Sequence, residues 1–490
     1  MTESRLVPER KSPLASRQHV PLRFLKSSLV VDSELTPNGE IAGWLEEERR
    51  SAGLSLERVP LDQLENWAFT ENGRIAHRSG RFFAIQGIEV STDWGEVPNW
   101  DQPIIDQPEV GFLGLIAREF GGVLHFLMQA KVEPGNLNAV QISPTLQATK
   151  SNYSRAHGGN APRYLEYFID ARPDEILLDQ LQSEQGARFL AKRNRNIIIE
   201  PEGELALTPS FRWLTLGQIK HLLRQPNLIN MDTRTVISGI SYGEFDDRAE
   251  YYFDLFARHF SSSNLPAISL LRSFLHAGDS LHSMEEILSW VTHLRSRYEL
   301  HITRKPLSEL RQWRIERDCI RHETNRFFKV IGTRIELHGR EVRSWCQPLI
   351  ESAQEGLLAF IIKPINGVYH FLVQAKLEPG NFDIIEFAPT VQCLTGNFRD
   401  NEPGQRPPYL DYVLSAAPEQ RLVDTMQSEE GGRFFQEQNR NLLVLADDEF
   451  PLATSENYRW MTLNQIKQFI RFNNYLNIQA RSLISAISFA

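Results

Sequence analysis

The residues best suited to chemistry occur in two near-identical patterns that lie far apart in the chain. The first is Gln129-Ala-Lys-Val-Glu-Pro-Gly-Asn136 followed by Pro144-Thr-Leu-Gln147, and the second is Gln374-Ala-Lys-Leu-Glu-Pro-Gly-Asn381 followed by Pro389-Thr-Val-Gln392. Carboxylate, ammonium and amide groups are those of acid–base catalysis and of polar ligand binding. A solvated sheet face tolerates most polar residues, so the repeated choice of these types favours a functional site.

Alternation of apolar and polar residues predicts that each pattern lies on a β-hairpin, because successive strand residues point to opposite faces. The apolar face would carry Leu124, Phe126, Met128, Ala130 and Val132, and the polar face His125, Gln129, Lys131 and Glu133. The second copy sets Phe371, Val373, Ala375 and Leu377 against His370, Gln374, Lys376 and Glu378. On the returning strand Val140, Ile142 and Leu146 would share the apolar face. Pro134-Gly135 and Pro379-Gly380 predict type II turns, in which the glycine takes a positive φ.

Composition limits the classes of protein. A chain of 490 residues can form two or three domains, and its formal net charge of −9 argues against a general nucleic-acid or anionic-membrane binder. Cys319, Cys346 and Cys393 have no CxxC spacing, which makes a disulfide framework or a cysteine zinc site unlikely to be the basis of the fold. The polar N-terminus and the lack of a long apolar run predict a cytoplasmic protein with no membrane segment.

An internal duplication decides the expected architecture. An offset of 245 residues relates His125 through Asn196 to His370 through Asn441 without a gap. We therefore expect an α+β fold of two tandem modules joined by a helical linker. The expected boundaries are a flexible N-terminal arm over residues 1–40, a first repeat over 41–240, a linker over 241–283 and a second repeat over 284–490. Within the first repeat, helices are expected over 41–52, 54–67 and 183–196, and a loop over 93–109.

The doubled pattern, together with Asn194-Arg-Asn196 and Arg212-Trp-Leu-Thr215, resembles the NDP-hexose 2,3-dehydratase family over nearly the whole chain. This resemblance implies two Nudix-like modules per subunit, a homodimer, and a dTDP-linked 4-keto-6-deoxyhexose as substrate. Neither repeat contains the Nudix pattern Gly-x5-Glu-x7-Arg-Glu-x-x-Glu-Glu, so no metal site is expected.

The reaction that the resemblance implies is an elimination. The proton on sugar carbon 3 is acidified by the ketone at carbon 4, and the hydroxyl on carbon 2 leaves. The enol then tautomerises to a 3,4-diketo-2,6-dideoxy sugar. The oxidation state is conserved overall, so no cofactor is expected, in agreement with the lack of a glycine-rich dinucleotide fingerprint. A 3-ketoreductase would have to consume the unstable diketone.

This chemistry needs a base, a donor to the enolate oxygen and an acid for the leaving hydroxyl. Glu133 and Glu378 are the candidate bases, because partial burial raises a carboxyl pKa. Lys131 and Lys376 would stabilise negative charge. His125 and His370 are candidate acids or bases, although a strand histidine is equally often structural. Glu386 stands where the first repeat has Gln141, which favours the second repeat as the catalytic one.

Further side chains are expected to bind the sugar or the nucleotide. Gln129, Gln374, Asn136 and Asn381 would donate hydrogen bonds to the sugar, and Arg195, Arg440, Arg188 and Arg433 would hold the pyrophosphate. Trp213 and Trp460 could stack on thymine, but a tryptophan before a helix cap is more often core. The other residues expected at the site are Thr145, Gln147, Asn152, Tyr164, Thr390, Gln392, Asn397 and Tyr409.

Two other functions fit the same residues. One is a non-catalytic protein that binds a sugar nucleotide on modules emptied of their metal. The other is a divergent nucleotide-diphosphate hydrolase, which the missing carboxylate pattern disfavours.

Overall fold

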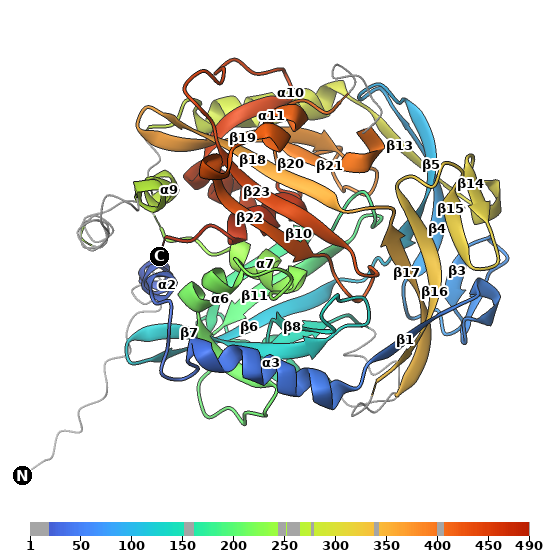
Figure 1. The fold of residues 1–490 in the computed structure, drawn as a ribbon, viewed down its shortest axis with the longest axis horizontal. Helices are drawn as coiled ribbons and strands as arrows, with labels where there is room; N and C mark the ends of the chain where they lie inside the picture. Colours follow the sequence, from blue (N-terminus) through green and yellow to red (C-terminus); the bar gives the residue numbers. More distant parts are fainter. Residues whose placement is uncertain are drawn as a thin grey trace, which may run out of the picture.

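The computed structural model describes residues 19–150, 161–243, 251, 265–275, 279–337, 343–398 and 406–489. It is a mixed α+β fold of two similar halves, as the duplication predicts (Figure 1). None of the helices in these ranges has the length and apolarity that a membrane crossing requires.

Each half contains a seven-stranded sheet with the same topology. The first sheet has the order β10-β11-β6-β7-β12, with β8 on β7 and β9 on β6, from β6 (Gly111–Phe120), β7 (Val123–Val132), β8 (Val140–Ser143), β9 (Leu146–Ala148), β10 (Ile176–Ser183), β11 (Arg193–Ile199) and β12 (Phe211–Thr215). The second has the order β22-β23-β18-β19-β24, with β20 on β19 and β21 on β18, from β18 (Gly356–Ile365), β19 (Val368–Leu377), β20 (Ile385–Ala388), β21 (Val391–Leu394), β22 (Arg421–Ser428), β23 (Gln438–Leu445) and β24 (Tyr458–Thr462).

The helices also occur in matching pairs. They are α2 (Val20–Leu29) and α9 (Leu265–Leu275), α3 (Asn38–Ala52) and α10 (Met284–Arg297), α5 (Leu165–Ile169) and α11 (Leu410–Ser415), α6 (Leu216–Leu222) and α12 (Leu463–Ile470), and α7 (Met231–Ser238) and α13 (Ile478–Ser485). Both α6 and α12 begin with a capping box, in which Thr215 and Thr462 each accept a hydrogen bond from the backbone of the glutamine three residues later.

The helices α2 and α9 lie in the segments expected to be the arm and the linker, and each packs on the repeat that follows it. Ser27 of α2 donates a hydrogen bond to the Leu124 carbonyl on β7, and Ser273 of α9 does the same to Tyr369 on β19. Each helix is therefore the first element of a repeat. The arm expected over 1–40 and the linker expected over 241–283 both include structured parts of the repeats, because these helices bury apolar residues against the strands.

Two smaller sheets exchange a strand between the repeats. β1 (Ser55–Val59) pairs with β16 (Phe328–Glu336), which also carries β17 (Ser344–Ser352), in a sheet with β14 (Trp313–Ile315) and β15 (Cys319–His322). β13 (Leu300–Lys305) pairs with β4 (Ala84–Thr92) beside β2 (Trp67–Phe69), β3 (Ile75–His77) and β5 (Asn99–Asp106). The helix expected over 54–67 is thus wrong, since this stretch gains its hydrogen bonds from the other repeat. The expected loop over 93–109 is also wrong in its greater part, because β5 pairs antiparallel with β4 of the same repeat.

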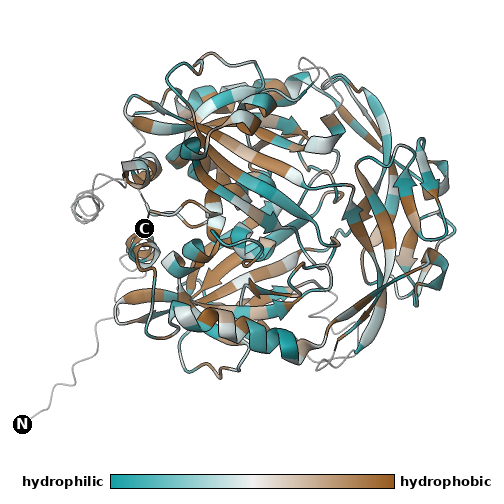
Figure 2. Cartoon of the chain, viewed as in Figure 1, coloured by the Kyte–Doolittle hydropathy of each residue, from teal (hydrophilic) through white to brown (hydrophobic). Residues whose placement is uncertain are grey.

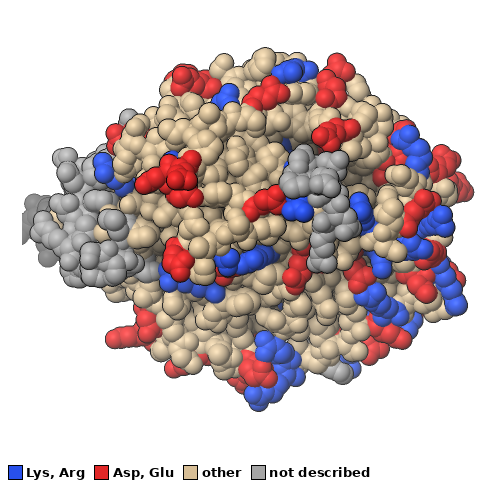
Figure 3. Space-filling model, turned by 45° about the horizontal axis from the view of Figure 1, so that its top comes forward, with Lys and Arg blue, Asp and Glu red and all other residues tan. Residues whose placement is uncertain are grey.

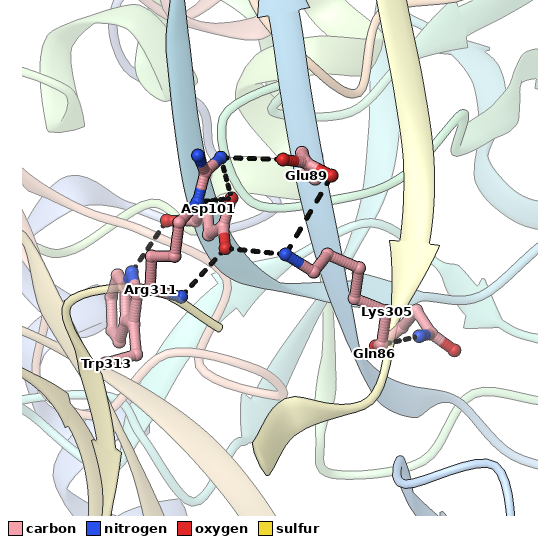
Figure 4. A network of polar contacts seen from close by, with 6 residues as sticks. All are labelled: Gln86, Glu89, Asp101, Lys305, Arg311 and Trp313. Atoms are coloured by element: carbon pink, nitrogen blue, oxygen red, sulfur yellow. Dashed lines mark hydrogen bonds and ion pairs between the residues drawn. The ribbon is translucent and has the colours of Figure 1, made fainter. Parts of the chain in front are cut away.

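A polar network fixes one of these exchanged strands (Figure 4). The carboxylate of Asp101 on β5 accepts a 3.1 Å bond from Lys305 on β13 and a 2.7 Å bond from Arg311. Burial opposes ionisation, but the bonds from Arg311 and Lys305 outweigh it and lower the pKa of Asp101. The network therefore holds the second repeat's strand on the first repeat's sheet.

Hydrophobic stretches run along the strands of the large and small sheets, whereas much of α3 and many connecting loops are hydrophilic (Figure 2). Leu124, Phe126, Met128 and Ala130 of β7 lie in the main core together with Phe371, Val373 and Ala375 of β19, which confirms the predicted apolar faces. Positive and negative side chains are interspersed on the face in Figure 3, most densely over the small sheets.

Candidate active site

The predicted hairpins hold their carboxylates in matching environments. Glu133 accepts a 2.7 Å hydrogen bond from Gln147, and Glu378 accepts a 2.8 Å bond from Gln392. The Lys131 ammonium lies 3.8 Å from Glu133, and Lys376 donates a 3.2 Å bond to the Gln392 carbonyl. The structure thus brings the lysine, glutamate and glutamine of each pattern together.

The N-cap residue of a helix donates a hydrogen bond to the side chain of each glutamine. Asn230, the N-cap of α7, donates a 3.2 Å bond to the side-chain oxygen of Gln147. Asn477, the N-cap of α13, makes the equivalent 2.8 Å bond to Gln392. Each glutamine amide is therefore oriented so that its N–H group points at the glutamate.

A loop from the opposite repeat closes each hairpin. The backbone N–H of Gly135 donates to the Gly431 carbonyl at 2.8 Å, and Gly380 donates to Gly186 at 2.7 Å. We call the cluster around Glu133 and Gly431 the first site, and the cluster around Glu378 and Gly186 the second site. The helix expected over 183–196 is therefore wrong, because Glu184–Lys192 leaves β10 as a crossing loop and only then enters β11.

Glycine is needed in both turns, but not for the positive φ that the sequence predicted. Neither Gly135 nor Gly380 has a positive φ, so the turns are not type II. A Cβ at Gly135 would overlap the carbonyl oxygen of Phe434, and one at Gly380 would overlap that of Phe189. Glycine is required because the backbone of the other repeat approaches too closely for a side chain.

The strand that returns from each hairpin also departs from the prediction. Val140 and Ile142 join the main core, but Leu146 packs on the other side of the sheet. The chain breaks at Pro144 and moves from β7 to β6, where the Thr145 hydroxyl accepts a bond from the Ile116 N–H. Thr390 does the same with Ile361, so both threonines hold the split between the strands.

Several buried polar atoms at the two sites make no hydrogen bond within the described part of the protein. They are one carboxylate oxygen of Glu133 and of Glu378, and both polar side-chain atoms of Asn136 and of Asn381. A buried polar group without a partner costs about 1–3 kcal/mol. Such a concentration at two matching positions indicates surfaces that bind a polar ligand.

The surroundings of Glu378 shift the pKa of its carboxyl in two opposing directions. Burial raises the pKa of its carboxyl, while the charges of Lys376 and Arg188 oppose that increase. Arg188 belongs to the first repeat, but its charge acts on Glu378 of the second. Its guanidinium stacks 4.3 Å from the centroid of the Phe328 ring. The carboxyl of Glu378 can therefore exchange a proton nearer to neutral pH than an exposed glutamate does.

The structure places the two histidines away from the carboxylates. His125 and Lys131 are six residues apart on β7, which is about 20 Å along a strand. The Nδ1 of His370 lies 3.0 Å from the Val368 carbonyl, and its Nε2 accepts a bond from the Leu281 N–H. His125 has the matching contacts with Val123 and the Ser33 hydroxyl. Both rings serve to connect backbone segments.

The expected aromatic residues lie in apolar packing. Tyr164 donates a 2.7 Å bond to the Ala206 carbonyl, and the Tyr409 ring packs on Tyr458. Trp460 is buried, with its indole N–H bonded to Leu452. Trp213 lines a surface pocket of about 400 Å³ with Leu35, Thr36, Leu207, Thr208, Pro209, Phe211 and Arg212. This pocket lacks the carboxylates and lysines of the two sites.

The remaining expected residues have other partners. Arg195 and Arg440 form ion pairs with Asp179 and Asp424 at 2.7 and 2.6 Å. Asn397 accepts a 3.2 Å bond from Gln354, and Asn152 lies outside the described residues. Gln129 and Gln374 are half-buried on the strands that carry the lysines. Arg433 bonds to Gln107 at 3.0 Å and stacks on Phe83.

Sequence reasoning missed Gly186, Gly431 and the two N-cap asparagines. The Ser183-Glu and Ser428-Glu repeats were visible, but nothing local signals that each crosses to the other hairpin. In the described ranges no group of three or more His, Cys, Asp or Glu side chains could hold a metal ion.

Comparison with known proteins identifies the class. The family model described as NDP-hexose 2,3-dehydratase matches residues 38–240 and again residues 284–487. The chain belongs to the NDP-hexose 2,3-dehydratase family.

Three relatives that match over nearly their full length are named as 2,3-dehydratases of a dTDP-linked sugar. The chain is 42% identical over 469 residues to the dTDP-4-dehydro-6-deoxy-alpha-D-glucopyranose 2,3-dehydratase of Saccharopolyspora spinosa, covering 95% of this chain and 94% of the relative. Enzymes of the same description from Streptomyces violaceoruber and Amycolatopsis orientalis are 42% and 39% identical, over 92% and 96% of this chain and 97% and 94% of theirs.

Proposed function

We propose that this chain is a dTDP-4-keto-6-deoxy-D-glucose 2,3-dehydratase, a hydro-lyase of deoxysugar biosynthesis. Full-length similarity to dehydratases for this substrate, where 4-dehydro and 4-keto name the same group, supports the activity. The observation that carries the mechanism is a buried carboxylate at each hairpin, with one oxygen bonded to a glutamine and the other without a hydrogen-bond partner among the described residues.

Glu378 is the proposed base. Gln392 fixes one carboxylate oxygen, so the other is oriented to accept the proton from carbon 3. The pKa that burial raises gives the carboxylate more proton affinity than an exposed glutamate has. The electron pair of the C3–H bond then forms the C3–C4 double bond of an enolate.

Lys376 is the proposed electrostatic partner. Lys376 lies on β19, two residues before the base, and its ammonium donates a hydrogen bond to the Gln392 carbonyl of β21. Negative charge that develops on the carbon-4 oxygen would be stabilised by this cation. Asn381, Gln374 and Gln392 would orient the sugar hydroxyls.

The first site retains the same set, with Lys131, Glu133, Asn136 and Gln147 beside Gln129. We propose that it also binds the sugar nucleotide and that the second site performs the elimination. Catalytic roles for His125 and His370, and nucleotide binding by Arg195, Arg440, Tyr164, Tyr409, Trp213, Trp460, Asn152, Thr145, Thr390 and Asn397, are not part of this mechanism.

The direct test is incubation with dTDP-4-keto-6-deoxyglucose with and without EDTA, with the products followed by NMR and mass spectrometry. Loss of one water that EDTA does not affect is the expected result. Binding without turnover would instead identify a non-catalytic sugar-nucleotide protein, and EDTA-sensitive release of a nucleoside monophosphate would identify a hydrolase.

The homodimer and the coupling to a 3-ketoreductase stay predictions from the resemblance, and the cytoplasmic location stays a prediction from the sequence. The reductase follows from the product, because a 3,4-diketo sugar is unstable and a reduction would remove it. Adding a 3-ketoreductase and its nicotinamide cofactor to the assay should therefore raise the yield of deoxysugar nucleotide.

A further inference from the structure

At two pairs of matching positions, one site has a carboxyl side chain where the other has an amide. The site that has the carboxyl differs between the two positions. On the returning strand the first repeat has Gln141 and the second has Glu386. In the first turn of the following helix the first repeat has Asp232 and the second has Gln479. All four side chains are buried. Each site therefore holds exactly one of these extra carboxyls, but on a different element.

Glu386 lies beside the proposed base and its lysine. It is directly opposite Lys376 in the pairing of β19 with β20, so the two side chains share one face of the sheet. Ser183, the last residue of β10 in the first repeat, donates a 2.8 Å bond to Oε2 of Glu386. The other oxygen, Oε1, is buried and has no hydrogen-bond partner among the described residues.

Gln141 shows what the same position looks like with an amide. Its Oε1 accepts a 2.9 Å bond from Ser428, and its buried Nε2 has no hydrogen-bond partner in the part of the chain that the structure describes. A protonated Glu386 bonded to Ser183 in the same manner would present an O–H group where Gln141 presents an N–H group. The amide can donate a hydrogen bond at this place, but it cannot transfer a proton.

We infer that Glu386 is the general acid that protonates the departing carbon-2 hydroxyl, an assignment that rests on the proposed function. Glu378 takes the carbon-3 proton, and the enolate electrons form the C2–C3 double bond as the C2–O bond breaks. The Oε1 proton of Glu386 goes to the leaving hydroxyl, which departs as water. In the tautomerisation the enol proton returns to Glu386 and protonated Glu378 delivers its proton to carbon 2, so both carboxyls are restored.

The surroundings suit a carboxyl that is neutral before the reaction. Burial raises the pKa of Glu386 to about 7, the nearby Glu378 adds to this, and Ser183, Arg481 and Arg295 oppose it. A group that titrates near neutral pH can both give and retrieve a proton.

The test compares Glu386→Gln with wild type on two substrates, the natural ketosugar and its 2-deoxy-2-fluoro analogue. Fluoride leaves without a proton, so it does not require the acid. We expect the variant to lose water from the natural substrate about 100-fold more slowly and to release fluoride within about threefold of wild type. In deuterated water the variant should still exchange the carbon-3 proton of the natural substrate.

A variant that dehydrates the natural substrate at the wild-type rate would overturn the assignment, as would equal losses on both substrates. Asp232→Asn is the matched variant at the first site, and a larger loss there than with Glu386→Gln would also overturn it. Thermal unfolding reports whether each variant folds. If Glu386→Gln does not, Glu386→Asp keeps an acid one methylene further away, and the same selective loss on the natural substrate is expected. A wild-type chain that dehydrates neither substrate would refute the proposed function itself.

Discussion

The backbone N–H of Gly380 donates a 2.7 Å hydrogen bond to the carbonyl oxygen of Gly186, which lies 194 residues earlier in the other repeat. Gly135 and Gly431 repeat this relationship at the first site. Each hairpin therefore receives its closing loop from the other repeat. A single repeat therefore does not supply the loop that closes its own hairpin.

Replacing Gly186 with alanine should disturb the second site selectively. The added Cβ would overlap the Asn381 amide and approach the Cβ of Glu378. Because small displacements of reacting groups are costly, we expect kcat to fall by about 100-fold. Gly431→Ala places the same change against Asn136 at the first site. Steady-state kinetics should show a loss at least tenfold smaller for it, and the reverse order would move the chemistry to the first repeat.

Features that depend on neighbouring residues were predictable from the sequence. The alternation along Leu124 to Val132 gave the strand and its apolar face, and Thr215-x-x-Gln218 gave a helix start. Features that depend on distant pairing were not. Residues 55–59 form a strand only because β16 supplies its hydrogen bonds, and the loop at Gly186 is ordered by Gly380.

The same division applies to the site. Lys376, Glu378 and Gln392 lie within one hairpin, so their spacing revealed that they meet. Arg188 reaches Glu378 from the other repeat, and Asn477 reaches Gln392 from a later helix. His370 was wrongly expected at the site. The strand pattern predicts which face of the sheet a side chain lies on, but it does not predict how far along the strand the site extends.

Lys376→Met should separate charge stabilisation from binding. Loss of the ammonium removes the cation beside the developing enolate, and we expect kcat to fall by about 100-fold or more. It also removes a charge that lowers the pKa of Glu378, so that pKa rises. The base must be ionised, and the acidic limb of the pH–rate profile should therefore move to higher pH. An unmoved limb would show that Lys376 does not act on Glu378.

His370→Ala should weaken the fold and spare the chemistry. The change leaves the Leu281 N–H without its acceptor, at a cost of about 1–3 kcal/mol in the free energy of unfolding. Turnover per folded molecule should stay within about threefold of wild type, because no transition-state contact is lost. Urea denaturation and activity measured on the same samples check both parts.

The pH dependence of that loss has a definite sign. Burial lowers the pKa of His370 in the folded protein. The ring's contribution is therefore present above the unfolded pKa of about 6.5 and is lost as the pH falls toward the folded pKa. Wild type and the alanine variant should converge in stability at low pH, and divergence there would contradict a neutral structural histidine.

Glu386→Gln should stabilise the protein at alkaline pH while it slows catalysis. The folded pKa of Glu386 is raised to about 7 from 4.5, so the folded state binds the proton more tightly than the unfolded chain does. Its contribution is favourable at low pH and decreases as the pH rises from 4.5 to about 7, by about 3 kcal/mol at most. Thermal unfolding at pH 8 should therefore give a higher Tm for the variant than for wild type, with the difference vanishing near pH 4. An equal Tm for the variant and for wild type at both pH values would show that burial does not raise the pKa of the Glu386 carboxyl.

The central claim is that Glu378 removes the proton from carbon 3 of the ketosugar. Mass spectrometry of dTDP-4-keto-6-deoxyglucose incubated in deuterated water with wild type, Glu378→Gln and Glu133→Gln tests it most directly. We expect Glu378→Gln to abolish both deuterium uptake at carbon 3 and loss of water, and Glu133→Gln to keep both. Deuterium uptake by Glu378→Gln at the wild-type rate would contradict it.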